Sequence, residues 1–211
     1  IKTALSQVVF SASRDESRPI LTGVMFVFEK NEVKIVATDS YRLAEKRIKS
    51  DQKFTETNSV IIPYGSIIEL LRILTINEEG VEFYLGDNQV MFGVGKTQII
   101  SRVIEGKYPD YEKIIPTTFT NSTIINKNEL NQALKVTGIF SRESANNIRL
   151  KIKQNELNLI AVAPQVGDNQ AKLKVQTTGE NMDIAFNSRY ILDVLNQIDA
   201  DEIELKTNKP N

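Results

Sequence analysis

Carboxylates, lysines, tyrosines and serines are the side chains of this chain that could take part in catalysis. The 211 residues include neither histidine nor cysteine. This removes the commonest general base, thiolate nucleophiles, disulfides and the usual ligands of zinc. Asp39 and Asp110 are candidate catalytic acids, but Asp39 in a Thr-Asp-Ser-Tyr run is more typical of a turn. Since the sequence has no P-loop glycines and no metal-ligand spacing, we expect no catalytic residue, no metal and no cofactor.

The composition is that of an ordinary globular protein. Charged residues make up 25% of the chain, hydrophobic residues 41%, and the net charge is −1. No apolar run approaches the roughly 20 residues that span a bilayer, and no secretory signal is visible. We therefore expect a cytoplasmic protein that does not interact with membranes. The chain begins with Ile1 rather than methionine, which suggests a piece of a longer protein.

The sequence contains an internal repeat. Three pairs of segments match in order: Ala4-Leu5 with Arg14 and Ala133-Leu134 with Arg142; Lys30–Ala37 and Gln154–Ala161; Val60–Leu74 and Ile184–Ile198. Self-similarity at a long period indicates a duplicated structural unit. Val81–Gln89 aligns with the final residues Ile203–Asn211, so Val90–Pro116 has no counterpart. We expect the second copy to stop before its last strands.

Each copy has the pattern of a helix followed by strands. In the first copy we expect helices over Lys2–Ser13 and from Pro63 onward, and strands over Val24–Phe28, Val33–Thr38, Tyr41–Ile48, Val81–Leu85, Gln89–Val94 and Gln98–Val103. In the second we expect helices over Lys127–Phe140 and Ser188–Ile198, a loop over Pro164–Asn169, and strands over Thr123–Asn126, Ile148–Lys153, Leu157–Val162, Ala171–Thr177, Met182–Phe186 and Glu202–Leu205. The prediction is an α+β fold of two repeated domains, 1–116 and 117–211, each with two helices packed on antiparallel β-sheets.

Basic residues are concentrated on the predicted helices. The helical segments and the arginines that follow them carry a net charge of +4, which leaves −5 for the rest of the chain. The candidate DNA-facing residues are Lys2, Arg14, Arg72, Lys127, Lys135, Arg142 and Arg189. Such a face could meet a phosphate backbone without reading sequence. The alternative is that a few surface bases happen to lie on helices.

Four motifs carry a resemblance to a known family. They are an Arg-Pro-x-Leu-x-Gly start at Arg18–Gly23, Val-Ala-Thr-Asp-Ser-x-Arg-Leu-Ala at Val36–Ala44, Gly-Lys-Tyr-Pro-Asp-Tyr at Gly106–Tyr111, and the helix start Asn187–Leu195. In this order and spacing, they resemble the bacterial DNA polymerase III β subunit, the replication sliding clamp. The resemblance covers essentially all 211 residues, as the second and most of the third domain.

The resemblance implies a DNA-clamp fold and a non-catalytic role. Members of the family have three repeats, and two subunits close into a ring whose helices line the hole. On this reading the protein is a processivity factor that encircles duplex DNA, and polymerase activity lies in a partner subunit. The implied partners are double-stranded DNA, the DNA polymerase III α subunit, the clamp loader and other clamp-binding proteins, with a homodimer in the full-length protein.

The resemblance also implies a cleft for partner peptides between the second and third repeats. The matching positions are Arg18, Leu21, Thr38, Ser40, Tyr41, Arg42, Leu43, Pro109, Lys113, Ile114, Asn187 and Tyr190. Leu21, Leu43 and Ile114 could instead be ordinary core residues, and Arg18 and Arg42 solvated strand-end charges. Tyr41 replaces a His common in the family and Lys113 a frequent Arg, which would alter peptide preference because lysine lacks the planar fork. The family's C-terminal tail supplies another wall, so we expect weak or absent peptide binding by this chain.

Ile139 and Phe140 match positions that contact the partner subunit's first repeat in the family. Their alternative role is to bury the end of the helix that starts at Lys127. Without a first repeat, we expect no closed dimer from this chain alone, and an unpaired sheet edge. Two further functions stay open: a peptide-binding module without DNA encirclement, and an enzyme that uses Asp39 or Asp110.

Overall fold

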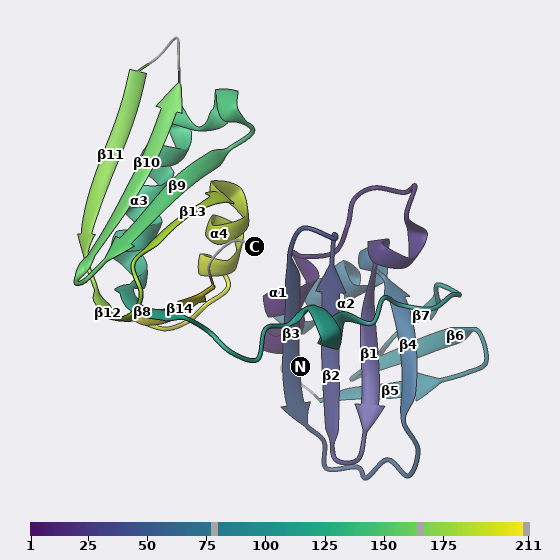
Figure 1. Ribbon diagram of the computed structural model, residues 1–211. Helices are drawn as coiled ribbons and strands as arrows, with labels where there is room; N and C mark the ends of the chain where they lie inside the picture. The colour runs from purple at the N-terminus through teal and green to yellow at the C-terminus, as the bar shows by residue number, and fades with distance from the viewer. Residues whose placement is uncertain (77–79, 164–166, 209–211) are drawn as a thin grey trace. The chain divides into compact units, whose positions relative to one another are not determined.

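The structure is a computed structural model that describes residues 1–76, 80–163 and 167–208. These residues form two compact units, unit 1 (Ile1–Asp110) and unit 2 (Tyr111–Asn211), each with its own helices and sheets (Figure 1). The boundary between the units follows residue 110, a few residues before the predicted join at residue 116.

The described part of unit 1 has two α-helices and two antiparallel sheets. Its elements are α1 (Lys2–Val9), η1 (Pro19–Thr22), β1 (Gly23–Glu29), β2 (Glu32–Thr38), β3 (Leu43–Lys49), β4 (Asn58–Pro63), α2 (Tyr64–Ile76), β5 (Val81–Leu85), β6 (Gln89–Val94) and β7 (Thr97–Arg102). The strands are ordered β3-β2-β1-β4 in one sheet and β5-β6-β7 in the other. In both sheets each strand is antiparallel to its neighbours.

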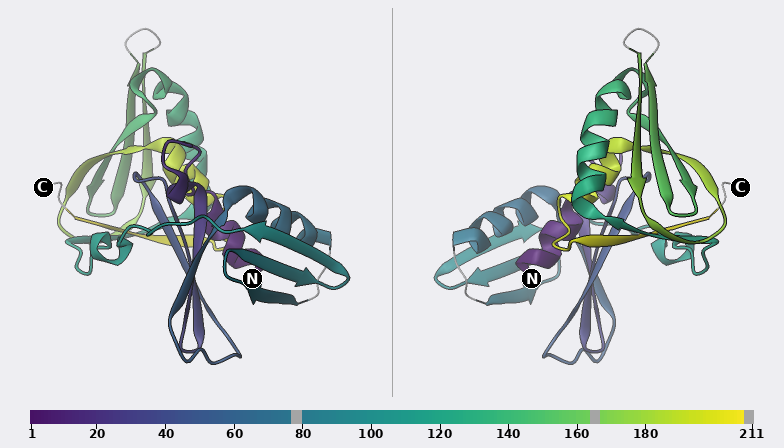
Figure 2. Two further views of the ribbon diagram at one scale, coloured as in Figure 1. Left: turned by 90° about the vertical axis from the view of Figure 1, so that its right-hand side faces the viewer. Right: turned by 90° about the vertical axis from the view of Figure 1, so that its left-hand side faces the viewer.

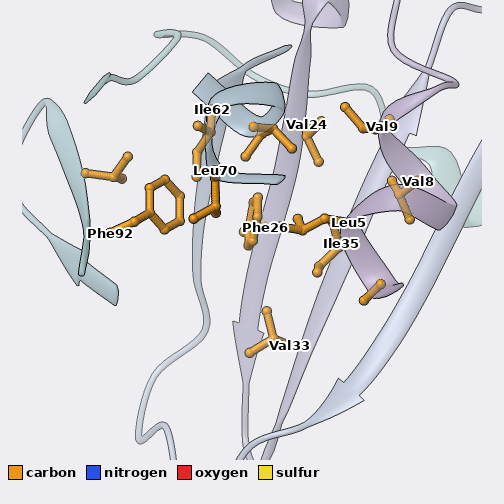
Figure 3. Packing of buried hydrophobic residues seen from close by; sticks show 14 of the residues in the cluster. Leu5, Val8, Val9, Val24, Phe26, Val33, Ile35, Ile62, Leu70 and Phe92 are labelled. Atoms are coloured by element: carbon orange, nitrogen blue, oxygen red, sulfur yellow. The ribbon is translucent and has the colours of Figure 1, made fainter. Parts of the chain in front are cut away.

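One apolar core joins the helices of unit 1 to its sheets (Figure 3). Leu5 and Val8 lie one turn apart on α1 and are fully buried, as the helical spacing of apolar residues predicts. Phe26 from β1 and Leu70 from α2 meet them, and Phe92 brings in the second sheet. Removing each such side chain from water stabilises the fold by about 1.5–3 kcal/mol. The core therefore fixes both helices on one side of the four-stranded sheet.

Unit 2 repeats this plan. Its elements are η2 (Tyr111–Ile114), β8 (Asn121–Asn126), α3 (Lys127–Phe140), η3 (Arg142–Ser144), β9 (Asn147–Lys153), β10 (Glu156–Ala163), β11 (Gly167–Lys174), β12 (Gln176–Gly179), β13 (Met182–Asn187), α4 (Ser188–Leu195) and β14 (Glu202–Thr207). One sheet has the order β11-β10-β9-β13 and the other the order β12-β8-β14. The core contains Leu130 and Leu134 of α3, Leu195 of α4 and Leu150 of β9.

The two units share one topology, which confirms the predicted α+β class. β9, β10, β11 and β13 take the places of β1, β2, β3 and β4, and α3 and α4 take those of α1 and α2. In each unit the two helices pack against the four-stranded sheet (Figure 2). The sequence repeat therefore corresponds to a repeat of structure.

Several predicted boundaries in unit 1 are wrong. The first helix ends at Val9 rather than Ser13, because Ser11 and Ala12 form tight turns and the N–H of Ser13 donates to the C=O of Leu21. The second helix begins at Tyr64, since Pro63 still pairs with Gly23 as the last residue of β4. β4 itself was not predicted as a strand.

Unit 2 differs from the prediction at three places. The strand expected over Ala171–Thr177 is two strands, because the chain passes at Val175 from one sheet to the other. The expected loop over Pro164–Asn169 is in part strand, as β11 starts at Gly167; residues 164–166 lie outside the described residues. α4 ends at Leu195 rather than Ile198.

Candidate functional site

The turn between β2 and β3 carries the densest group of predicted cleft residues. Thr38 pairs with Leu43 at the end of the hairpin, and four residues connect them. The Asp39 carboxylate accepts the N–H groups of Tyr41 at 2.9 Å and Arg42 at 3.0 Å. Ser40 has φ +78°, in the left-handed region. Asp39 is therefore a turn former, which was the sequence-based reading, and its oxygens are occupied within the turn.

Arg42 is held inward rather than solvated. Its Nε donates to Asp39 Oδ2 at 3.0 Å and its Nη2 donates to the C=O of Phe10 at 2.9 Å. The guanidinium carbon also lies 5.4 Å from the centre of the Phe10 ring. Charge-assisted bonds of this kind fix a side chain more firmly than neutral ones. No pattern in the sequence indicated a role for Phe10, which lies just after α1 and outside the predicted cleft.

Three further hydrogen bonds involve the turn, and one of them connects it to Arg18, just before η1. Thr38 Oγ1 donates to the C=O of Arg42 at 2.7 Å and accepts the N–H of Ser40 at 3.1 Å. Arg18, which precedes η1, donates from Nη1 to Ser40 Oγ at 3.0 Å. The structure therefore brings Arg18, Thr38, Ser40 and Arg42 into one network.

The apolar members of the predicted cleft differ in exposure. Leu21 is buried in η1 and Leu43 is half-buried at the start of β3. Tyr41 is 80% exposed at the tip of the turn, and Ile114 in η2 is 69% exposed. Leu21 thus fits the alternative of core packing, whereas Tyr41 and Ile114 offer apolar surface to a ligand.

Tyr108 places the segment after β7 against the end of β2. Its side chain is buried, which raises the pKa of the phenol to about 12, and a backbone interaction with Thr38 partly offsets this effect. Pro109 follows it and is exposed. Pro109 therefore lies next to the β2 end within unit 1.

The remaining cleft candidates belong to unit 2. Lys113 and Ile114 lie in η2 and are exposed. Asn187 is the N-cap of α4: its side chain accepts the N–H of Arg189 at 3.0 Å and donates to the C=O of Ala145 at 3.3 Å. Tyr190 is half-buried in the first turn of the same helix.

The predicted DNA-facing residues are less uniform than the sequence suggested. Arg14 lies beyond the end of α1 and Arg142 lies in η3, so the four α-helices carry a net charge of +2 rather than +4. Lys127 is half-buried and its ammonium donates to the C=O of Ile198 at 2.8 Å. Arg72 pairs with Glu69 at 3.1 Å.

Arg14 stacks on an aromatic ring. Its guanidinium carbon lies 3.9 Å from the centre of the Tyr64 ring, and Nη2 donates to the Tyr64 hydroxyl. Lys2, Lys135, Arg142 and Arg189 are exposed. The most accessible positive charges of the helix pairs thus come from both units.

The two predicted dimer-contact residues differ in exposure. Ile139 is 54% exposed near the end of α3, while Phe140 packs against the core of unit 2. Phe140 therefore fits its alternative role in burying the helix end, and Ile139 presents apolar surface.

Residues 1–76, 80–163 and 167–208 contain no group of three or more acidic side chains that could hold a metal ion. None of the helices within these ranges is long and apolar enough to cross a membrane.

Known proteins resemble this chain throughout its length. Residues 1–110 match the family model of the DNA polymerase III beta subunit, central domain, and residues 112–211 match that of its C-terminal domain. A beta sliding clamp of Staphylococcus aureus is 34% identical over 215 residues, which cover all of this chain and 57% of that relative.

Solved structures give the same result. A DNA polymerase sliding clamp from Bacillus subtilis is 33% identical with a TM-score of 0.94, over 99% of this chain and 56% of that one. A sliding clamp from Pseudomonas aeruginosa bound to griselimycin is 27% identical with a TM-score of 0.94, over 99% and 56% of the two chains. The chain thus spans a little over half the length of its relatives. It belongs to the DNA polymerase III β subunit family and has the DNA-clamp fold.

Proposed function

We propose that this chain is the second and most of the third domain of a ring-shaped replication clamp. In the whole protein, two subunits encircle duplex DNA and act as a processivity factor. The observation that carries the proposal is the duplicated helix pair, α1 with α2 and α3 with α4, on equivalent sheets in a member of this family. We place the domain junction between Asp110, where the first unit ends, and the predicted join at Pro116.

The charges of the helix pairs are suited to sliding. Exposed bases such as Arg14, Lys135 and Arg142 can attract phosphates, but they are few. Each phosphate contact adds to the salt dependence of binding and resists movement along the duplex. A ring holds DNA by topology, so a weak attraction is enough.

In this proposal the protein itself catalyses no reaction and works in the cytoplasm. Polymerase activity belongs to the DNA polymerase III α subunit, and ring opening belongs to the clamp loader. Both would bind through a peptide cleft to which unit 1 contributes the network of Arg18, Ser40 and Arg42 and the exposed Tyr41. Unit 2 would contribute Lys113, Ile114, Asn187 and Tyr190. Ile139 would contact the partner subunit of the homodimer.

The proposal is tested with the full-length protein, a clamp loader and nicked circular DNA. We expect the protein to stay on the circle after loading and to leave when the circle is cut. A protein that binds clamp-partner peptides but is never retained on circular DNA would be a peptide module only. Retention that is equal on circular and linear DNA would also contradict encirclement.

The cleft is tested by titrating a labelled peptide from the polymerase against the full-length protein. One buried anchor side chain contributes about 1.5–3 kcal/mol, so two anchors with backbone bonds are expected to reach micromolar affinity. Arg42→Ala should weaken binding at least tenfold, because Asp39 and the Phe10 carbonyl lose their common partner. Lys46→Ala on the neighbouring β3 is the control and should bind as the parent does. Equal affinities for parent and Arg42→Ala would contradict the proposed cleft.

A further inference from the structure

A groove in unit 1 has a lining that shares no residue with the proposed cleft. It has a volume of about 570 Å³ and three walls. β1 and β4 supply Met25, Ser59 and Ile61; the β5–β6 turn supplies residues 85–87; the segment after β7 supplies residues from Val103 to Tyr108. This size is within the range of ligand pockets. All of its lining residues belong to unit 1.

One long side of the groove is the outer edge of β4. The C=O of Ile61 accepts the N–H of Ile104 at 2.8 Å, so the peptide groups of Ile61 point away from β1. Because the backbone groups of a strand alternate in direction, Ser59 points outward as well, while Val60 and Ile62 bond to β1. In the described part of the chain, neither backbone group of Ser59 has a partner, nor does the N–H of Ile61.

The other half of this edge is closed. Pro63 is the next outward residue and has no N–H to offer, and Ile104 already occupies the carbonyl of Ile61. Proline and short covering segments are common devices that stop unwanted strand pairing. β4 is therefore protected at its C-terminal end and open at Ser59, beside the groove.

Unit 2 provides a natural comparison. The repeat aligns Met25 with Arg149 and Ser59 with Asp183. Arg149 and Asp183 form a two-pronged ion pair on the outer face of that sheet, with Nη2 2.7 Å from Oδ2. Charges at an edge oppose the addition of an apolar strand. The same positions of unit 1 hold a neutral methionine and a serine.

We propose that the open edge of β4 binds an extended peptide segment of a partner protein by strand addition. The partner's backbone bonds to Ser59 and to the N–H of Ile61, and one of its side chains enters the groove. Met25 and Ile61 are only 7% and 5% exposed, so the backbone bonds carry most of the affinity. Backbone bonds give affinity in this mode and the side-chain pocket gives selectivity. The Asp87 and Lys107 side chains, also part of the lining, select residues at the two ends of the segment. This site is separate from the cleft proposed above and does not depend on a clamp function.

The first test is amide hydrogen exchange in the ¹⁵N-labelled 211-residue chain. In the free chain, Ser59 and Ile61 should exchange at least tenfold faster than Val60 and Ile62. The probe is acetyl-Thr-Val-Thr-Val-Lys-amide, which should slow exchange at Ser59 and Ile61 and shift their resonances. The same peptide methylated at its backbone nitrogens should do neither. Equal effects of both peptides would overturn strand addition.

Variants of Ser59 separate the role of its backbone N–H from the role of its side chain. Ser59→Pro removes only an outward N–H, so it should fold and lose peptide binding at least tenfold. Ser59→Ala keeps the N–H and should bind as the parent does. Ser59→Asp places at this exposed edge the carboxylate that unit 2 has at the equivalent position, and it should also abolish binding. Peptide binding that survives both Ser59→Pro and Ser59→Asp would overturn the proposal.

The longer protein supplies the final check. If the Ser59 and Ile61 amides exchange as slowly as Val60 and Ile62 in the full-length protein without peptide, another segment of the chain covers this edge. That result would overturn binding of a partner at this site. Fast exchange in the full-length protein, with protection on adding the peptide, would support it.

Discussion

The joint between the two helices is built differently in the two units. In unit 1, the exposed Arg14 after α1 stacks on the half-buried ring of Tyr64, the first residue of α2. Tyr64 aligns with Ser188 in unit 2, and there the joint is buried: the hydroxyls of Ser141 and Ser188 lie 3.3 Å apart. Since Ser141 donates its proton to the C=O of Gly138, Ser188 donates to Ser141. The same meeting point is thus made by a cation and a ring in one unit and by two hydroxyls in the other.

This difference shows which features the two copies of the repeat share and which they do not. The apolar spacing of the helices is kept, because it sets which faces are buried. The residue that joins them changes with its surroundings: Ser188 is 2% exposed and lies beside Gly138, where a ring would not fit. Exposed contacts of the Arg14 type contribute little free energy, whereas buried polar groups are costly when left without partners.

The largest effect is expected from Ser188→Val. The change removes a buried hydroxyl that donates to Ser141, and it adds a methyl group at a position that is only 2% exposed. We expect the free energy of unfolding of unit 2 to fall by about 2–4 kcal/mol. Urea unfolding followed by amide resonances of each unit measures this. The matched control Tyr64→Val, at a half-buried ring that packs against the core of unit 1, should cost that unit less, under about 2 kcal/mol. Similar losses at both joints would contradict the comparison.

The next effect is an alkaline transition confined to unit 1. Burial raises the pKa of Tyr108 to about 12 in the folded protein, above its ordinary value of 10.0. The contribution of the protonated Tyr108 phenol to the stability of unit 1 is therefore fully present below pH 10 and is lost as the pH rises through about 12. The loss should be about 2–3 kcal/mol. Tyr108 lies in the stretch that has no counterpart in unit 2, and Tyr108→Phe should remove the transition. Its survival in that variant, measured by urea unfolding between pH 9 and pH 12, would contradict the assignment.

The sequence predicted most of the helices and strands of both units. α3, β5 and β6 have the predicted bounds, because strong periodicity and clear turns delimit them. The prediction failed where tertiary contacts determine the secondary structure. Pro63, for example, favours a helix start but pairs with Gly23 as the last residue of β4. The prediction also missed the passage of the chain between two sheets at Val175, since a bend inside a polar alternating run leaves no pattern.

The peptide site stays a prediction, although the structure brings part of it together. The resemblance identified Arg18, Thr38, Ser40 and Arg42, and the structure joins these residues by hydrogen bonds. Nothing in the sequence indicated that Phe10 would hold Arg42, because its carbonyl is a backbone group of no particular residue type. The open edge at Ser59 was equally invisible, as edge strands are defined by what lies beside them.

A smaller effect is expected at the exposed joint itself. Arg14→Lys keeps the charge but loses the flat guanidinium that stacks on Tyr64. The free energy of unfolding of unit 1 should fall by about 0.5–1 kcal/mol, as for other exposed cation–π pairs. Lys2→Arg on α1 is the control and should be neutral. A fall in the free energy of unfolding of more than about 2 kcal/mol would show that the Arg14–Tyr64 contact matters as much as the buried Ser141–Ser188 contact, and would contradict the comparison.

The smallest effect is expected at the outer ion pair of unit 2. The hydrogen bond from Arg149 holds the pKa of Asp183 below its ordinary value of 3.8, so the pair stabilises unit 2 above that pH and ceases to do so as the pH falls through the lowered pKa. Asp183→Asn should therefore lower the urea midpoint of unit 2 slightly at pH 7, and this difference from the parent should shrink as the pH falls below 3.8. The equivalent change Ser59→Asn in unit 1 has no charge to remove and should show no such pH dependence. A difference between Asp183→Asn and the parent that does not shrink with falling pH would mean that the carboxylate acts through packing rather than through its charge.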